Sequence, residues 1–280
     1  MEQNRIGISS ACFYPEETFC AVRHCTDLGI TNIEIFMNSF SELTPPYLSR
    51  IAEHCQQTNT HITSIHPFTS GYEYLLFFSA YKKRAADSAE FYRMYFHAAA
   101  FLGADFVVFH GDAARNPFIG MDNYCEAFYR LQQTAASEGV KIAHENVSGA
   151  RGGNPAFMRE LHTRFGKGNI QFVFDVKQAL RGGIRPQEMI DAMAGDICHV
   201  HINDWDFPSN TEADGNVSGK SAGCRLPFAG QLDLPAILRQ IEATGYAGRY
   251  CIEVYRDNFT DDSEIVTAYQ KLWQTLLNVD

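Results

Sequence analysis

Short apolar runs alternate with longer stretches of helical spacing along the whole chain. The apolar runs predict strands at residues 6–9, 32–36, 62–66, 106–110, 141–146, 170–175, 197–202 and 250–255. The stretches between them predict helices at 16–28, 45–57, 74–102, 123–138, from 155, from 186, at 234–244 and at 262–277. Several of these stretches stop at a glycine, the residue that most often follows a helix. The pattern therefore predicts eight strand–helix units.

Alternation of this kind predicts a parallel sheet, because parallel strands need crossover connections. The strand runs are apolar on both faces, as expected when helices cover one side and a core fills the other. An open doubly wound sheet usually has a glycine-rich first turn, but residues 9–15 contain no G-x-G-x-x-G motif. We therefore expect one α/β domain over residues 1–280, folded as a (β/α)₈ TIM barrel.

A charged or imidazole side chain stands at the tail of seven of the eight apolar runs. A strand that served packing alone would end in neutral residues, because burying an unpaired charge is costly. Seven such residues at the same place in successive strands indicate a ring of functional groups at one end of the barrel. They are Glu34, His66, His110, Glu145, Asp175, His201 and Glu253.

The last four of these residues indicate a metal site. They end four consecutive strands, so a barrel would bring them together. Each alone could cap a helix or pair with an arginine, but three clustered carboxylates repel one another unless a cation lies among them. Three carboxylates and one imidazole suit Mn²⁺, Mg²⁺ or Co²⁺, and Zn²⁺ is an alternative.

Charge, cysteine content and hydrophobicity argue against several classes of protein. The formal net charge of −10 argues against a nucleic-acid partner, which requires a basic surface. None of the eight cysteines forms a Cys-x-x-Cys pair, so we expect reduced cytoplasmic thiols rather than a thiolate zinc site. The N-terminal residues lack an apolar signal core, and no run approaches the roughly 20 apolar residues of a membrane span. We expect a cytoplasmic protein without a membrane segment.

Four motifs give the chain a resemblance to the xylose isomerase-like TIM-barrel superfamily. They are His144-Glu145-Asn146, Phe174-Asp175, the run from His199 to Asp204, and Ile252-Glu253. That superfamily groups sugar and sugar-phosphate isomerases and epimerases, inosose dehydratases and endonuclease IV. The resemblance covers nearly the whole chain and implies a barrel enzyme that acts on a small carbohydrate; relatives are often homo-oligomers.

The resemblance also implies roles for individual residues. In the isomerases and epimerases of the superfamily, residues that match Glu145, Asp175, His201 and Glu253 bind one divalent metal, and the two glutamates act as acid and base. Such a metal acidifies a C–H next to a carbonyl and stabilises an enediolate, so that a nearby carboxylate can move the proton. We expect a metal-dependent isomerase or epimerase of a sugar, sugar phosphate or related polyol. An inosose-type dehydratase and a catalytically degenerate sugar-binding barrel are alternatives.

A second group of residues leaves a hydrolase as an alternative function. Residues that match His66 and His110 help to hold a second metal in endonuclease IV-like relatives, which are multi-metal phosphodiesterases. The same residues could instead bind substrate, and Glu34 could orient one of them or act as a pocket acid. Gln178 stands where the superfamily often has a metal-binding histidine, and residues 205–230 contain no histidine. These two departures argue against a trinuclear site.

Substrate contacts are expected from loops at the same end of the barrel. The 149–154 loop is glycine-rich, and the 205–230 loop is long and polar. Basic side chains in these loops would favour a phosphorylated or carboxylated substrate, although any one of them could be ordinary solvated surface. The expected substrate-binding residues are Asn146, Lys177, Gln178 and Arg225.

Overall fold

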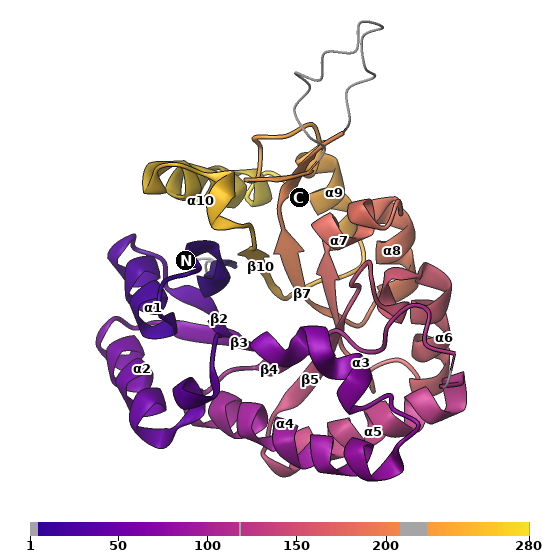
Figure 1. The fold of residues 1–280 in the computed structure, drawn as a ribbon. Coiled ribbons are helices and arrows are strands. Elements are labelled where there is room, and N and C mark those ends of the chain that lie inside the picture. The colour runs from indigo at the N-terminus through magenta and orange to yellow at the C-terminus, as the bar shows by residue number, and fades with distance from the viewer. Residues whose placement is uncertain (1–4, 118, 208–222, 280) are drawn as a thin grey trace, which may run out of the picture.

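Eight parallel strands close into a barrel in the computed structural model, which describes residues 5–117, 119–207 and 223–279 (Figure 1). The strand order around the barrel is β1-β10-β7-β6-β5-β4-β3-β2. The expectation of a closed (β/α)₈ barrel is thereby confirmed. The strands are β1 (Ile6–Ser9), β2 (Asn32–Met37), β3 (His61–Pro67), β4 (Phe106–Phe109), β5 (Lys141–Glu145), β6 (Phe172–Asp175), β7 (Ile197–Ile202) and β10 (Arg249–Ile252).

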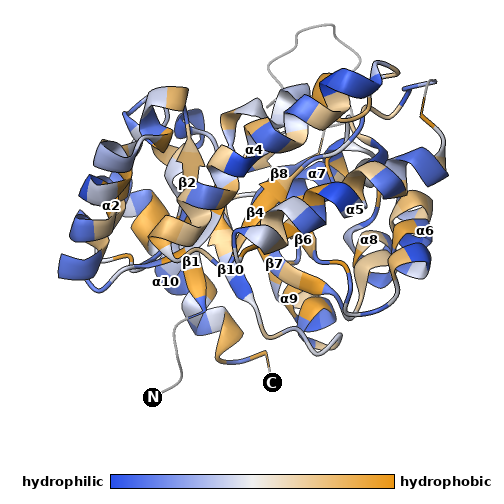
Figure 2. Cartoon of the chain, turned by 90° about the horizontal axis from the view of Figure 1, so that it is seen from below, coloured by the Kyte–Doolittle hydropathy of each residue, from blue (hydrophilic) through white to orange (hydrophobic). Residues whose placement is uncertain are grey.

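Helices surround this barrel. Their apolar stripes pack on the strands and their polar faces point outwards, as the colouring in Figure 2 shows. The outer helices are α1 (Thr18–Asp27), α2 (Pro45–Gln57), α4 (Lys82–Leu102), α5 (Met121–Ser137), α6 (Pro155–Phe165), α8 (Pro186–Met193), α9 (Leu234–Glu242) and α10 (Asp262–Leu276). Two short helices, α3 (Glu73–Leu76) and α7 (Val176–Arg181), follow β3 and β6. None of the helices in the described part of the chain is long and apolar enough to cross a membrane.

The prediction of one continuous helix at 74–102 is wrong, because the helix is interrupted. Helix α3 ends at Leu76 and α4 begins at Lys82. Between them, Phe77 and Phe78 are both buried, and Phe78 stacks on Tyr124 with ring centroids 4.4 Å apart. Phe77 also packs edge-on against Tyr92 of α4, with ring centroids 4.7 Å apart, so the segment between the two helices is anchored by its own aromatic side chains. Tertiary packing therefore interrupts the helical pattern.

The loop expected at 205–230 contains a short hairpin. Strand β8 (Asp204–Asp206) pairs antiparallel with β9 (Gly223–Arg225), and Trp205 lies opposite Cys224. The Asp204 carboxylate accepts hydrogen bonds from the backbone N–H groups of Gly230 and Leu232 at 2.9 and 3.0 Å. The hairpin and this carboxylate fix the two ends of the loop beside the carboxyl end of β7. Residues 208–222 lie outside the described part of the chain.

Candidate metal centre

The four residues expected to bind metal come together at the carboxyl end of four neighbouring strands. Glu145 and Asp175 are the last residues of β5 and β6, His201 is the fifth residue of β7, and Glu253 directly follows β10. Asp175 and His201 are register partners of adjacent strands. Glu145, Asp175 and His201 are buried, and the Glu253 side chain is 13% exposed. Closure of the barrel thus joins residues up to 108 positions apart.

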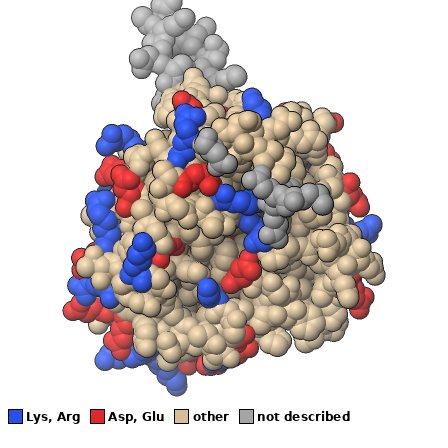
Figure 3. All heavy atoms as spheres, turned by 180° about the vertical axis from the view of Figure 1, so that it is seen from behind, with Lys and Arg blue, Asp and Glu red and all other residues tan. Residues whose placement is uncertain are grey.

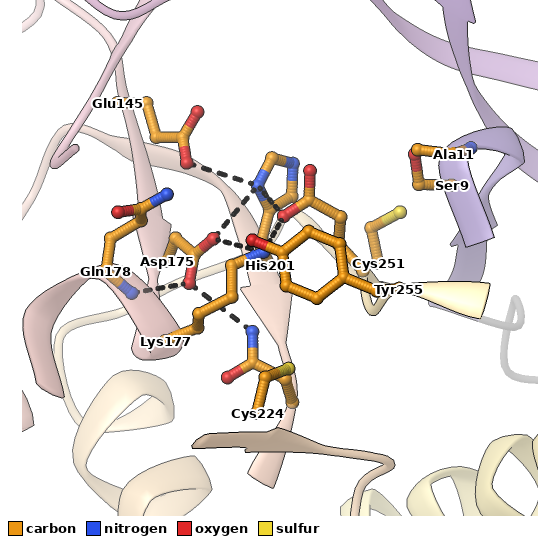
Figure 4. A network of polar contacts seen from close by, with 12 residues as sticks. Ser9, Ala11, Glu145, Asp175, Lys177, Gln178, His201, Cys224, Cys251 and Tyr255 are labelled. Atoms are coloured by element: carbon orange, nitrogen blue, oxygen red, sulfur yellow. Dashed lines mark hydrogen bonds and ion pairs between the residues drawn. The ribbon is translucent and has the colours of Figure 1, made fainter. Parts of the chain in front are cut away.

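His201 lies at the centre of this set. Its Nδ1 atom is 3.5 Å from Glu253 Oε2, 3.7 Å from Glu145 Oε1 and 3.8 Å from Asp175 Oδ2. It is buried without a hydrogen-bond partner among the described residues. Figure 4 shows the Glu145 and Asp175 side chains directed at the imidazole ring. A nitrogen lone pair that faces three carboxylates is an arrangement that a bound cation would stabilise.

The spacing of these atoms suits a divalent ion. The four candidate ligand atoms all lie within 4.8 Å of one another. A cation bonded to nitrogen and oxygen at about 2.1 Å keeps neighbouring ligand atoms about 3–3.5 Å apart. The four ligand atoms therefore need to move only slightly closer together to hold a divalent ion. Glu145, Asp175, His201 and Glu253 fit a metal ion by donor type, geometry and charge.

Two neighbours orient Asp175. Its Oδ1 atom accepts hydrogen bonds from the backbone N–H of Gln178 at 3.0 Å and from the Asn203 amide at 3.3 Å. The first of these caps helix α7. With Oδ1 engaged, Oδ2 is the oxygen that faces His201. The helix start thus fixes the rotamer of the carboxylate.

Glu34 lies beneath His201 rather than at a strand end. The expected position is wrong because β2 continues to Met37, which places Glu34 inside the barrel. Glu34 Oε2 is 3.1 Å from His201 Nε2 and accepts a hydrogen bond from the Ser64 hydroxyl at 2.7 Å. Burial alone would raise the pKa of Glu34, but the charge and hydrogen bond of His201 lower it overall. A proton on Nε2 leaves the Nδ1 lone pair for a cation.

His66 and His110 form a second group around Glu145. The Nε2 atom of His110 is 3.0 Å from Glu145 Oε2, and that of His66 is 3.7 Å from the same oxygen. Together the three residues could hold a second ion, with Glu145 shared between both groups. Burial would raise the pKa of Glu145, but His110 and its neighbours hold it well below its usual range. Glu145 is therefore an anion between two clusters.

Lys177, which is expected in a loop at this end of the barrel, lies buried in α7. Its Nζ atom is 2.6 Å from Glu253 Oε2 and 3.3 Å from Asp175 Oδ2. The Tyr255 ring covers the ammonium at 5.2 Å (Figure 4). Burial would lower the pKa of Lys177, but the two carboxylates raise it well above its usual range. The lysine is thus a cation inside the ligand set.

The other expected substrate contacts have protein partners. The Asn146 amide bonds the backbone of Asp175 through both of its polar atoms, at 2.6 and 2.9 Å. Gln178 Oε1 accepts from the hydroxyl and N–H of Ser148, and Arg225 pairs with Asp206 at 2.8 Å. These contacts tie the loops to the barrel rim; direct contact with a substrate stays a prediction for all three.

Glu73 is a supporting residue that the sequence pattern does not reveal. Its buried carboxylate accepts hydrogen bonds from the backbone N–H groups of His110 and Gly111 and from the Tyr92 hydroxyl, at 2.6 to 2.7 Å. Burial raises the pKa of Glu73 well above its usual range. The residue fixes the end of β4, from which His110 projects. Nothing in the local sequence marks it, because an acid in a helical stretch is ordinarily solvated.

One face of the molecule carries charges of both signs. Figure 3 shows acidic and basic side chains intermingled over one face of the molecule, with no continuous basic area on that face. The face therefore offers no extended track for a nucleic-acid backbone.

Several solved structures share this fold. Similar structures include a D-tagatose 3-epimerase-like protein (TM-score 0.76, 19% identity, 98% of each chain covered). They also include 3-keto-D-glucoside 4-epimerase from E. coli (0.71, 16%, 98% of this chain and 100% of that chain). The IolI protein, solved with a zinc atom, is similar too (0.70, 19%, 98% and 96%). No curated protein matches the sequence.

These structures are too distant in sequence to assign the chain to a family, but a family model does so. The model of the xylose isomerase-like TIM barrel matches residues 22–276, which is most of the chain. The match includes all seven residues placed at strand ends by the sequence pattern. It confirms the resemblance carried by the motifs on β5, β6, β7 and β10. The chain belongs to the xylose isomerase-like TIM-barrel family.

Proposed function

We propose that this protein is a divalent-metal-dependent isomerase or epimerase of a small carbohydrate. The observation that carries the proposal is the convergence of three carboxylates on the unpartnered Nδ1 atom of His201. Structural neighbours named as sugar epimerases add support at the level of the fold. Glu145, Asp175, His201 and Glu253 would hold the ion, which would be Mn²⁺, Mg²⁺, Co²⁺ or Zn²⁺.

A bound ion supplies Lewis acidity, which makes a C–H beside a carbonyl easier to deprotonate. The chain supplies the groups that move the proton. Glu145 and Glu253 project from strands separated by β6 and β7, so they approach the His201 side chain from different directions. Two carboxylates placed in this way can remove a proton from one face of a carbon and return one to the other.

Burial suits this chemistry. Glu145 is almost fully enclosed, whereas Glu253 keeps part of its side chain exposed. Exclusion of water strengthens the interaction of both carboxylates with a developing charge. We expect Glu253 to be the first of the two to meet an entering substrate, with His66 and His110 beside Glu145 as contacts for substrate hydroxyls.

The test is a search for proton exchange. The protein, loaded in turn with Mn²⁺, Mg²⁺, Co²⁺ and Zn²⁺, is incubated with ketoses, ketose phosphates and inososes in D₂O. We expect deuterium at the carbon next to a carbonyl and an isomeric product of unchanged composition. Loss of water from the product would indicate the dehydratase instead. Absence of metal binding would contradict both activities and favour a degenerate sugar-binding barrel.

A multi-metal phosphodiesterase is the second candidate. The cluster of His66, His110 and Glu145 favours it, because Glu145 could bridge two ions. That activity predicts at least two metals per chain and cleavage of a phosphodiester, whereas the isomerase needs one. Elemental analysis of the loaded protein, together with an assay on abasic DNA, separates the two functions.

A further inference from the structure

Lys177 occupies an unusual place for a lysine. It is 3% exposed, and its ammonium lies against two of the four residues that would bind the metal. Lysine is seldom buried, because its strongly hydrated charge must lose water. Helix α7 starts at the Asp175 cap, and Lys177 is its second residue, so the backbone directs this side chain over the carboxyl ends of β6 and β7.

The oxygens that contact Lys177 are the ones that face the centre of the site. Glu253 Oε2 is 2.6 Å from the ammonium and 3.5 Å from His201 Nδ1. Asp175 Oδ2 is 3.3 Å from the ammonium and 3.8 Å from the same nitrogen. The ammonium and a metal ion would therefore share two ligand atoms. Both are cations, so each weakens the hold of these oxygens on the other.

We propose that Lys177 is a built-in counter-cation that lowers the metal affinity of the centre and keeps its ligands together when the metal is absent. The inference rests on the proposed function, because it presumes a metal at this site. It assigns Lys177 a positioning role on Glu253 and Asp175 and makes the metal exchangeable.

The surroundings of Lys177 support a fixed position. The Tyr255 ring covers the ammonium, and the Arg181 guanidinium donates a hydrogen bond to the Tyr255 hydroxyl at 3.1 Å. Tyr255 is two residues beyond Glu253, so the same short segment carries both the carboxylate and the ring that hold the lysine. A cation held from two sides can stay beside a carboxylate pair without a solvent shell.

The test measures metal affinity rather than activity. Lys177→Met removes the charge and keeps most of the apolar stem. We expect Mn²⁺ to bind this variant on the order of tenfold more tightly than the wild type, measured by competition with a fluorescent chelator. We also expect the metal-free variant to melt at a lower temperature than metal-free wild type, and Mn²⁺ to raise its melting temperature by more than it raises that of the wild type.

Two further variants make the result specific. Lys177→Arg restores a cation and should return the affinity towards the wild-type value. Lys141→Met removes an exposed lysine at the opposite end of β5 and should leave the affinity unchanged. If Lys177→Met does not fold by circular dichroism, Lys177→Gln takes its place, because it is neutral and can still hydrogen-bond Glu253.

The outcomes separate the two proposals. Tighter binding by the folded neutral variant, reversed by arginine, supports the counter-cation role. Equal or weaker binding overturns it and leaves Lys177 as an ordinary support for the ligands, while the metal-dependent function stands. If the wild type binds no divalent ion at this site, the proposed function fails, and the counter-cation role fails with it.

Discussion

Glu34 Oε2 lies 3.1 Å from Nε2 of His201, and both side chains are fully buried inside the barrel. The carboxylate comes from β2 and the imidazole from β7, strands that are separated by β1 and β10 and so do not pair. One nitrogen of His201 is therefore fixed by the barrel core, and the other is presented to the rim. The arrangement matches the carboxylate–histidine pairs that orient metal ligands.

Glu34→Gln tests this relationship. The substitution keeps the shape but removes the charge that favours a proton on His201 Nε2. We expect metal affinity to fall by roughly 10- to 100-fold, measured by chelator competition. Ser64→Ala is the matched control, because it removes the other hydrogen bond to Glu34 and leaves His201 untouched. A large loss in the control and none in Glu34→Gln would contradict the assignment.

Glu145→Gln and Glu253→Gln test the proton-transfer roles. Each amide keeps the size of the side chain but cannot accept a proton from carbon. We expect each variant to lose turnover by on the order of 10³-fold or more while its circular dichroism stays unchanged. Glu264→Gln, at the exposed N-terminal cap of α10, serves as the control and should retain activity. Full activity of either site variant on the true substrate would refute the mechanism.

Gly152→Ala tests the contact between the 149–154 loop and the centre. A Cβ atom at this position would lie 2.7 Å from the Glu145 carbonyl oxygen and 2.8 Å from the His144 ring. The backbone must shift, at a cost of about 1–3 kcal/mol of unfolding free energy, and Glu145 would move with it. Gly149→Ala is the control in the same loop, because its Cβ meets nothing within 4 Å. Urea unfolding and turnover of both variants check the expectation.

The buried acid Glu73 should make the stability of the folded protein depend on pH. Burial raises its pKa in the folded protein, so folding favours the protonated acid. Its stabilising contribution is complete at pH values below its ordinary pKa of about 4.3 and is lost as the pH rises through the higher folded value. Glu73→Gln does not titrate at this position. We therefore expect wild type to lose stability relative to this variant between pH 5 and pH 8, measured by urea unfolding at each pH. A difference that stays constant over this range would contradict the expectation.

Much of the architecture could be predicted because it depends on local patterns. Eight apolar runs and the helical stretches between them give a parallel barrel, since crossover connections leave few other closed arrangements. The convergence of the four candidate ligands could be predicted because each stands at or near the end of a strand, and strand ends meet at one rim. The break after Leu76 could not be predicted, because it depends on where Phe77 and Phe78 find room in the core.

The candidate metal site likewise has features that the sequence predicts and features that it does not. The strand predicted at 32–36 already extends past Glu34, but the linear pattern could not reveal that the Glu34 side chain lies inside the barrel beneath His201. The burial of Lys177 could not be predicted either, since a basic residue after a strand usually points to solvent. Its burial depends on Asp175 and Glu253, which are 78 residues apart and meet only when the barrel closes.

The sequence by itself determined the strand–helix repeat, the closed barrel and the identity of the four candidate ligands, because these depend on periodicity and on the order of residues along each strand. Only the tertiary structure decided how those residues are supported. Glu34 under His201, Glu73 behind His110 and Lys177 between Asp175 and Glu253 are contacts across strands and loops. Their energies depend on distance and burial in three dimensions, and a linear pattern carries neither quantity.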